Sequence, residues 1–382
     1  MIIVYEPFCV GWNHVPVNSD FLLIISERFP NDEIVFIGEK EHIQHVKEKN
    51  DIQSDLINYK NIDVIEPSMG KIKSILNERK NIIQIAKEYK NKAALFFILN
   101  SHPHTMFFAK RYFDESIPII FLLHGNLEEL KRKKRFYQLG YWIKPAFLYK
   151  KKRKNMKFIV LGESIRNNVL KYIDFIKDDL IAVPHPYSMY EVKDGFKRNN
   201  NAKTVFGMIG SFSQAKRSEL IFKLEERIRD LSIPNVEFLL VGADDQNGFP
   251  CNTNVRILGE GNRKLSDAEY NSGIEMLDYV LFFWPNDSYL MTASGAVHDA
   301  IAHRKPIISI RTPYLTWIFE NIGQIGYLCN DFDELVRVVT QISKGEMKED
   351  INAFLNNYDK AAAFFSKDNV SNIMNDYNVW MI

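Results

Sequence analysis

A glycine-containing loop in the second half of the sequence carries residue types that suit a phosphate group. In residues 207–220, GMIGSFSQAKRSEL, an apolar run ends at Gly210 and Ser211, and a helix is expected from about Ala215. Glycine lets the backbone approach a ligand closely, and the free N–H groups of a helix start favour phosphate. Lys216 and Arg217 would add the positive charge that a leaving diphosphate needs. The alternative is a plain glycine turn with two solvated basic residues, and the spacing matches neither a Walker A loop nor a dinucleotide fingerprint.

A second loop also carries residues that suit a phosphate group and, in addition, an acid that suits a ribose. Residues 291–310 read MTASGAVHDAIAHRKPIISI, in which small residues open a helix. Thr292 or Ser294 is expected to cap this helix, and Ser294 and Gly295 would leave unpaired N–H groups facing an anion. Asp299 lies about one turn further along, where its carboxylate can accept hydrogen bonds from both ribose hydroxyls. The alternative is that Asp299 is a first-turn acid that only complements the helix dipole.

The elements that must position these loops are short apolar runs alternating with helical patterns, which predicts parallel sheets. Helical spacing appears, for example, at 19–29 and 72–89. The strand candidates are 1–6, 33–38, 62–67, 94–99, 118–124 and 157–162 in the first half, and 204–210, 236–242, 255–259, 279–285 and 305–310 in the second. The fold class is therefore α/β, with two Rossmann-like, doubly wound parallel-sheet domains in tandem. Ligands of such sheets lie beyond the carboxyl ends of the strands, where both loops fall.

A polar stretch at 192–203, VKDGFKRNNNAK, separates the two halves and reads as a linker. The predicted boundaries are 1–190 for an N-terminal Rossmann-like domain and 200–365 for a C-terminal one. Residues 366–382 form a final helical segment.

The C-terminal half resembles the donor domain of GT-B glycosyltransferases, and the closest type is family 4. That family closes its donor site with a motif of the type Glu-Ala-Met-Ala-Cys-Gly-x-Pro-Val-Ile, and the matching run here is 299–308. The segment VPHPY at 183–187 stands where the family often has a Pro-Asn-Gly turn, and IIFLLHG at 119–125 matches a strand that ends in histidine. The resemblance implies two domains facing a cleft, with a C-terminal helix over 366–382 that crosses back to the N-terminal domain.

The match departs from the family pattern at three positions. The family has a first acid eight positions before the second, and Met291 stands there in this sequence. The retaining mechanism associated with that acid is therefore not carried over. The second acid is Asp299 instead of glutamate, which shortens its reach by one methylene, and Arg304 replaces the glycine of the motif.

Histidines supply the catalytic candidates. His14 follows the first strand candidate, where inverting GT-B enzymes often keep a general base, and His124 stands where the family places a histidine near the donor sugar. An imidazole titrates near the working pH and can take the proton of an acceptor hydroxyl. A hydrogen-bonded loop histidine is the alternative for each. His102 and His104 are weaker candidates, and a zinc site built from these four would need a tetrahedral convergence that spacing does not show.

Charge is distributed unevenly. Residues 131–157 hold 12 Lys/Arg and no Asp/Glu, so the rest of the chain has 37 basic against 48 acidic residues. Two basic clusters, 131–135 and 150–154, flank rings of the kind enriched at membrane interfaces. We expect peripheral attachment to an anionic membrane surface; nucleic acid could use the same features, but the acidic remainder argues against it. A merely solvated charge run is the alternative, although it leaves the six aromatic rings unexplained. These rings are Phe136, Tyr137, Tyr141, Trp142, Phe147 and Tyr149.

The sequence thus predicts a metal-independent glycosyltransferase, hexosyl or related, with a nucleotide-sugar as co-substrate and no further cofactor. The donor would contact Gly210, Ser211, Lys216, Arg217, Thr292, Ser294, Gly295 and Asp299. The acceptor would be a glycan or lipid-linked glycan of bacterial surface polysaccharide synthesis, at the inner face of the cell membrane. No transmembrane run and no signal peptide are apparent, and three distant cysteines fit a reducing cytoplasm. A sugar-nucleotide epimerase of this fold and a non-catalytic nucleotide-sugar-binding protein are the alternatives.

Overall fold

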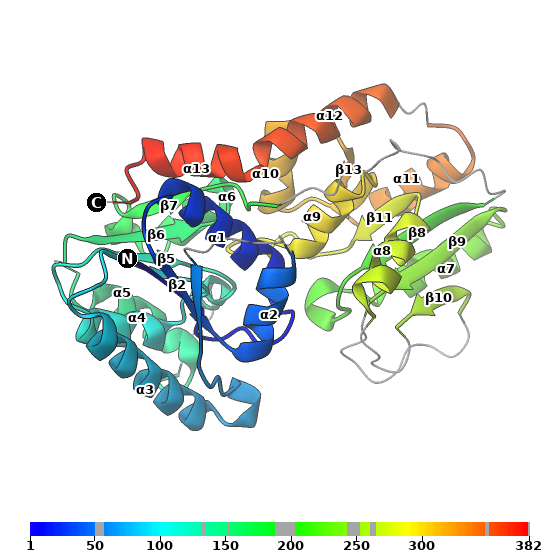
Figure 1. The fold of residues 1–382 in the computed structure, drawn as a ribbon. Coiled ribbons are helices and arrows are strands. Elements are labelled where there is room, and N and C mark those ends of the chain that lie inside the picture. Colours follow the sequence, from blue (N-terminus) through cyan, green and yellow to red (C-terminus); the bar gives the residue numbers. More distant parts are fainter. Residues whose placement is uncertain are drawn as a thin grey trace. The chain divides into compact units, whose positions relative to one another are not determined.

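The computed structural model describes residues 1–49, 57–131, 135–151, 153–187, 203–242, 253–259, 265–347 and 351–380 (Figure 1). The chain divides into two compact units. The first consists of Met1–Ser188, Met291–Ala293 and Phe365–Ile382, and the second of Met189–Leu290 and Ser294–Phe364. Across the described residues, no helix combines the length and the apolar character needed to cross a bilayer.

The first unit is built on a seven-stranded parallel sheet in the order β3-β2-β1-β4-β5-β6-β7. Its strands are β1 (Ile2–Tyr5), β2 (Ile34–Gly38), β3 (Ile57–Asn61), β4 (Leu95–Ile98), β5 (Ile119–Leu122), β6 (Met156–Val160) and β7 (Leu180–Ala182). Its helices are α1 (Val15–Arg28), α2 (Lys40–Lys49), α3 (Lys71–Tyr89), α4 (Pro103–Tyr112), α5 (Ile143–Leu148), α6 (Glu163–Leu170) and α13 (Lys367–Asp376). Short 3₁₀ turns are η1 (Pro67–Met69), η2 (Asn126–Lys131), η3 (Leu139–Trp142) and η4 (Asp174–Ile176).

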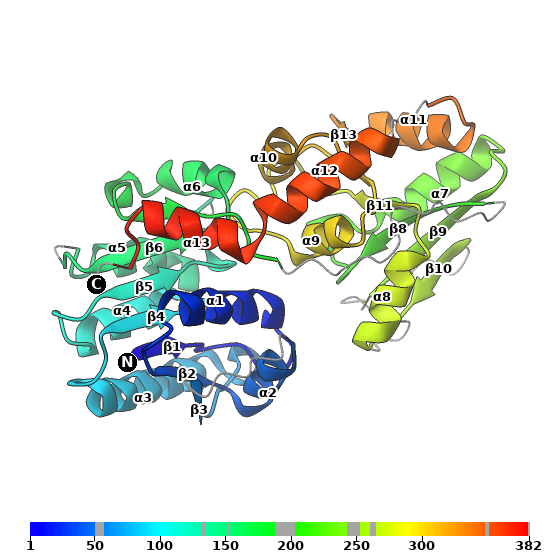
Figure 2. The same ribbon diagram turned by 45° about the horizontal axis from the view of Figure 1, so that its top comes forward.

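The central strands are continuous apolar runs because helices cover both faces of the sheet. Every residue of β1, β4 and β5 is buried. Figure 2 shows β1 and β2 between α1 on one side and α3 on the other. The sequence Ile57–Asn61, INYKN, is polar by comparison, and it forms the edge strand β3 with one neighbour only. The expected strand at 62–67 is therefore wrong: a half-exposed edge strand does not need an apolar run, and Pro67 already starts a 3₁₀ turn.

The C-terminal helix α13 lies against α1 in the first unit. The Trp380 ring packs edge-on against Phe29 at 5.4 Å between centroids, and Lys367 pairs with Glu27. Ser366 caps α13 by accepting a hydrogen bond from the Asn369 N–H at 3.1 Å. The last segment of the chain is thus part of the domain formed by the first half of the sequence.

The second unit holds a six-stranded parallel sheet in the order β10-β9-β8-β11-β12-β13. Its strands are β8 (Thr204–Ile209), β9 (Val236–Val241), β10 (Val255–Leu258), β11 (Tyr279–Phe282), β12 (Ile307–Ile310) and β13 (Gly326–Cys329). Its helices are α7 (Leu220–Asp230), α8 (Asp267–Glu275), α9 (Gly295–Ala302), α10 (Pro313–Ile322), α11 (Phe332–Ser343) and α12 (Ile351–Phe364), with a 3₁₀ turn η5 (Gln214–Lys216). The prediction of two parallel-sheet α/β domains is confirmed, although the sequence interpretation missed the short strands β7 and β13.

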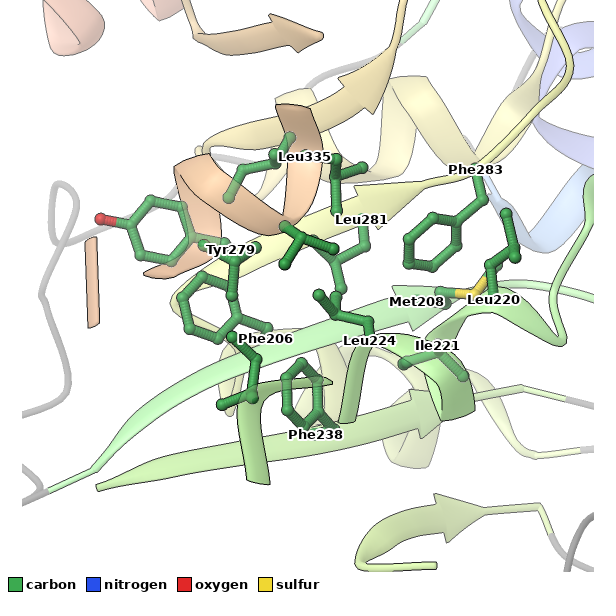
Figure 3. Packing of buried hydrophobic residues seen from close by; sticks show 14 of the residues in the cluster. Phe206, Met208, Leu220, Ile221, Leu224, Phe238, Tyr279, Leu281, Phe283 and Leu335 are labelled. Atoms are coloured by element: carbon green, nitrogen blue, oxygen red, sulfur yellow. The ribbon is translucent and has the colours of Figure 1, made fainter. Parts of the chain in front are cut away.

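The core of the second unit lies between its sheet and the helices α7 and α11. Figure 3 shows side chains from β8, β9 and β11 pointing toward those of the two helices. Phe206 stacks on Tyr279 at 5.1 Å between ring centroids, and both rings are fully buried. Leu224 from α7 and Leu335 from α11 complete this layer. This packing fixes β8 and β11, the two strands whose following loops were predicted to bind the donor.

Glycines at strand ends permit a backbone contact that side chains would block. Gly242 follows β9 with φ +145°, and a Cβ built there would lie 2.0 Å from the carbonyl oxygen of Gly210. The turn after β8 therefore packs directly on the turn after β9, with no room for a methyl group.

We expect Gly242→Ala to lower the free energy of unfolding by about 2–4 kcal/mol, because the methyl group displaces the Gly210 turn and φ is positive. Gly345→Ala is the matched control: φ is +70°, but the added Cβ meets no atom within 4 Å. The control should cost about 1 kcal/mol from backbone strain alone. Denaturant unfolding of both variants measures the difference, and equal losses would show that the Gly242–Gly210 contact tolerates a side chain.

Candidate functional site

The predicted phosphate loop lies directly after the central strand β8. Gly210 has φ +87° and its N–H donates to the Val241 carbonyl at 2.9 Å, which turns the chain out of the sheet. The expected helix from Ala215 is only the 3₁₀ turn η5, and α7 begins at Leu220. The reason is that Arg217 adopts the left-handed conformation, φ +52°, which ends the turn before the α-helix starts.

Lys216 is held against this turn. Its ammonium donates to the Ser211 carbonyl at 2.8 Å and to the Ser211 hydroxyl at 2.9 Å. The same Nζ lies 3.9 Å from the position a Gly210 Cβ would take. The positive charge is thus fixed beside the glycine turn, whereas Arg217 is exposed to solvent.

The second predicted loop leads into α9, which begins at Gly295. Ser294 is the N-cap residue by backbone geometry, but its side chain makes no capping hydrogen bond, contrary to the expectation. A Cβ on Gly295 would meet no atom within 4 Å, so the first turn of α9 opens on free space. Helix starts of this kind accept anions at their N–H groups.

Asp299 lies outside the first turn of α9. Its carboxylate is half-buried and accepts a hydrogen bond from the Tyr270 hydroxyl of α8 at 2.9 Å. Its position does not match that of a first-turn acid that only complements the helix dipole. Tyr270 is a residue that sequence reasoning missed, because nothing in the sequence spacing connects α8 with α9.

Gly210 joins the two loops. The position of a Gly210 Cβ lies 3.5 Å from the Ala296 Cβ in α9, 4.0 Å from the Tyr270 hydroxyl and 3.9 Å from the Lys216 ammonium. A glycine turn, a cation, a helix start and a carboxylate therefore meet at the carboxyl ends of β8 and β11 in one domain. This set of groups suits a ligand that carries phosphate at one end and hydroxyls at the other.

Thr292 is assigned to the first unit with Met291 and Ala293, whereas the other predicted donor residues are assigned to the second unit. The hydroxyl oxygen of Thr292 is buried and has no hydrogen-bond partner among the described residues. The N–H of its neighbour Met291 donates to the Glu128 carboxylate at 2.6 Å. Glu128, which sequence reasoning missed, thereby places a carboxylate beside the position where the sequence lacks the family's first acid.

The catalytic candidates of the first unit lie together. His14 and His124 are in edge-to-face contact at 4.3 Å between ring centroids, and His185 lies 6.4 Å from His124. They follow β1, β5 and β7, whose carboxyl ends share one edge of the sheet. His102 is turned onto Phe8 instead, stacked at 3.6 Å, and His104 pairs with Glu78. Sequence reasoning missed His185, because the segment 183–187 was considered only as a turn.

Burial favours the neutral form of the three histidines in this cluster. Desolvation lowers the pKa of His14 and lowers that of His124 well below its ordinary value. It also lowers the pKa of His185 to about 4, in spite of the ring's hydrogen bond with the Pro186 carbonyl. Neutral imidazoles close together are able to accept a proton from a bound hydroxyl group.

A buried carboxylate builds the loop that carries His14. Glu6, fully buried at the end of β1, accepts hydrogen bonds from the N–H groups of Phe8 and Cys9 and from the Asn18 amide. Its charge opposes the desolvation that lowers the pKa of His14. His14 itself has φ +58°, a strained conformation for a non-glycine residue that the surrounding contacts must maintain. Glu6 is a positioning residue that sequence reasoning missed, because acids at strand ends are common.

The middle of the family-like motif at 299–308 is structural. The Lys305 ammonium is buried and donates to the Glu275 carbonyl at 3.0 Å, and His303 contacts the Glu275 carboxylate at 2.6 Å. Arg304 pairs with Asp359 at 2.8 Å. These contacts attach the end of α9 to its neighbours, whereas Asp299, the first residue of the motif, contacts Tyr270, whose hydroxyl lies beside the Gly210 turn.

Across the described residues, no three His, Cys, Asp or Glu side chains gather as ligands for one metal ion. The four-histidine zinc site is therefore not formed there, since His102 stacks on Phe8 and His104 pairs with Glu78. Asp244 and Asp245 lie outside the described residues.

Comparison with known proteins relates the whole chain to one fold. The sequence matches no family model and no curated protein. Among solved structures, sucrose-phosphate synthase from Thermosynechococcus elongatus is similar with a TM-score of 0.63 and 13% identity, over 100% of this chain and 99% of that one. HepE from Anabaena in complex with UDP-glucose has a TM-score of 0.62 and 12% identity, over 99% and 100%. TarM from S. aureus has 0.64 and 10%, over 98% and 99%. The two parallel-sheet domains thus match the GT-B fold of glycosyltransferases.

The contact between Asp299 and Tyr270 gives a test of the donor site. Asp299→Asn should weaken the binding of a nucleoside diphosphate sugar about tenfold or more, because a charge-assisted hydrogen bond to a ribose hydroxyl is lost. Tyr270→Phe should have a smaller effect in the same direction, since it only releases the carboxylate. Asp359→Asn is the control, an exposed acid of the same unit paired with Arg304. Calorimetric titration with UDP-glucose and other nucleotide sugars measures the affinities, and an Asp299→Asn variant that binds like wild type would remove Asp299 from the site.

Proposed function

We propose that the chain is a nucleotide-sugar-dependent glycosyltransferase. The observation that supports this most strongly is the meeting of the Gly210 turn, the Lys216 ammonium, the start of α9 and Asp299 within one domain. Phosphate oxygens would be bound by backbone N–H groups and by the cation, and Asp299 would accept hydrogen bonds from the ribose. The GT-B fold supports the same assignment, since the TarM structure is described as containing UDP and the HepE structure as containing UDP-glucose.

The proposed reaction moves a hexosyl or related sugar from the donor to an acceptor hydroxyl without a metal ion or a further cofactor. Lys216, Arg217 and the dipole of α9 would offset the charge of the leaving diphosphate. The acceptor would be bound by the first unit, where a neutral histidine takes the hydroxyl proton. Product analysis separates the alternatives: an epimerase changes the sugar of the donor without acceptor, and donor hydrolysis or transfer to an acceptor excludes a non-catalytic binding protein.

We further propose that the acceptor is a lipid-linked glycan of bacterial surface polysaccharide synthesis and that the protein acts at the inner face of the membrane. One similar fold belongs to WaaB, described as a lipopolysaccharide outer core galactosyltransferase, with a TM-score of 0.62 and 14% identity over the full length of both chains. Support from this chain is the basic, aromatic segment 131–157. Phe136, Tyr137, Tyr141 and Trp142 are exposed there.

Two members of that segment have structural roles instead. The Phe147 ring is buried against Phe158 at 5.0 Å, and Arg153 is buried with its guanidinium donating to the carbonyls of Phe113, Asp114 and Ile117. A test of membrane attachment must therefore leave both unchanged.

The pH dependence of transfer tests the proposed base. Because burial lowers the pKa of His14 and of His124, each imidazole stays neutral to a lower pH than an ordinary histidine, and the acid limb of kcat/KM should lie below about pH 6.5. His14→Gln or His124→Gln should lower kcat about 100-fold or more and remove the limb, according to which residue is the base. His45→Gln, which loses a ring stacked on Trp12, is the control. An acid limb unchanged in both variants would exclude both histidines as the base.

Sedimentation with vesicles tests the membrane proposal. Wild type should pellet with vesicles that contain phosphatidylglycerol and should dissociate as salt screens the charges. The triple change of Lys144, Lys151 and Lys154 to Gln should weaken this binding by about tenfold to a hundredfold, given roughly 1 kcal/mol for each basic residue. The same change at the exposed Lys40, Lys87 and Lys90 is the control. Equal recovery with neutral and anionic vesicles would contradict the proposal.

A further inference from the structure

The first unit contains an apolar pocket of about 730 Å³ that is remote in sequence from the donor loops. Helices α3, α4 and α5 and the turn η3 form it. Its lining includes Ile75 from α3, Phe107 and Phe108 from α4, Trp142 from η3, and Leu148 and Tyr149 from the end of α5.

The pocket is held open by specific contacts. The buried Lys110 of α4 donates to the carbonyls of Ala146 and Phe147 at 2.9 and 3.2 Å, which fixes α5 against α4. The Tyr149 and Phe107 rings pack at 4.3 Å between centroids. The indole N–H of Trp142 donates to the Phe136 carbonyl at 2.9 Å, so its polar atom is satisfied outside the pocket. These contacts build a wall that does not depend on a ligand to form.

Exposed apolar side chains continue from both sides of this pocket. On the side of α3, Met69, Ile72 and Leu76 are 71%, 75% and 57% exposed. Ile72 and Leu76 lie on adjoining turns of α3 with the pocket residue Ile75, and Met69 ends the 3₁₀ turn η1 just before this helix. On the other side the exposed group is Phe136, Tyr137, Tyr141, Trp142 and Leu148. Exposed apolar surface of this extent marks an interaction site in a protein.

The charge around the pocket indicates what the partner is. Lys71 and Lys73 flank Ile72, Arg135 precedes Phe136, and Lys144 lies in α5; all four are exposed. Apolar side chains that alternate with cations suit the boundary between acyl chains and anionic head groups. A second protein surface with this pattern would have to be both apolar and strongly acidic.

We propose that this pocket binds one hydrocarbon chain of the membrane-borne, anionic acceptor lipid, while Met69, Ile72 and Leu76 enter the bilayer beside it. The identity of the occupant as an acceptor rests on the proposed function, but the binding of a hydrocarbon chain does not. The surface predicted at 131–157 thus extends to η1 and α3, which carry no comparable basic cluster and were not expected to take part.

Monomeric amphiphiles test the pocket without any transfer reaction. Trp142 lines the pocket, so dibromoundecanoate below its critical micelle concentration should quench its fluorescence, and Trp142→Phe should lose this quenching. Alkyl maltosides of increasing length should displace the brominated chain with affinities that rise about fourfold for each methylene until the pocket is filled. No saturable quenching, or no dependence on chain length, would overturn the proposal.

Three variants separate the pocket from its surroundings. Ile75→Gln should weaken dibromoundecanoate binding at least tenfold, whereas Ile72→Gln should leave it unchanged but reduce sedimentation with anionic vesicles. Leu231→Gln, an apolar residue 58% exposed in the second unit, is the matched control for folding and for both assays. If Ile75→Gln binds dibromoundecanoate as tightly as the wild type does, the assignment is wrong. It is also wrong if quenching is absent because two copies of the chain dimerise through this face. If quenching follows the expected pattern but no sugar is transferred, the proposed function fails and the hydrocarbon site stands.

Discussion

The carboxyl ends of parallel strands all lie at one edge of a sheet. Each loop that follows a strand must turn there toward a helix that covers one face of the sheet. In this protein those turns use backbone conformations with positive φ: Gly210 after β8, Gly242 after β9, Asn100 after β4, Gly125 after β5 and His14 in the loop after β1. Such turns redirect the chain at the edge of the sheet, and at Gly242 the backbone packs so closely on Gly210 that no side chain fits. The candidate residues of both domains are concentrated at these edges because the topology brings the turns together.

The two domains meet this constraint in different ways. In the second unit the glycine turns after β8 and β9 pack backbone against backbone, and the Lys216 side chain is hydrogen-bonded to the loop after β8. In the first unit the loop after β1 is organised by the buried charge of Glu6, which accepts two backbone N–H groups and the Asn18 amide. A backbone-lined site suits phosphate, whereas a loop held by a buried carboxylate can maintain a strained histidine beside two others.

Sequence reasoning predicted most strands of both sheets, because buried parallel strands are apolar on both faces and are therefore easy to recognise. It failed at the polar edge strand β3 and at the short β7 and β13, where few apolar residues are needed. For the site, the same rule selected His14, His124 and Gly210 in the loops after strands, and Asp299 was selected by its place about one turn inside the following helix. It could not find Tyr270 or Glu128, because their roles depend on contacts between segments far apart in the sequence. It also missed Glu6, because acids at strand ends are common.

The segment 131–157 shows why composition alone is insufficient to define a surface. Its charge and aromatic content predicted an interfacial segment, but in the fold some of its side chains are buried and others are exposed. Phe147 and Arg153 serve the core, and Lys150 pairs with Glu115 at 2.5 Å. The residues that remain exposed are joined by Met69, Ile72 and Leu76, which lie more than 50 positions earlier in the sequence. An interfacial surface thus consists of the side chains that remain exposed after the core has packed. Here the packing of α3, α4 and α5 determines which side chains those are, and the three helices leave a pocket between them.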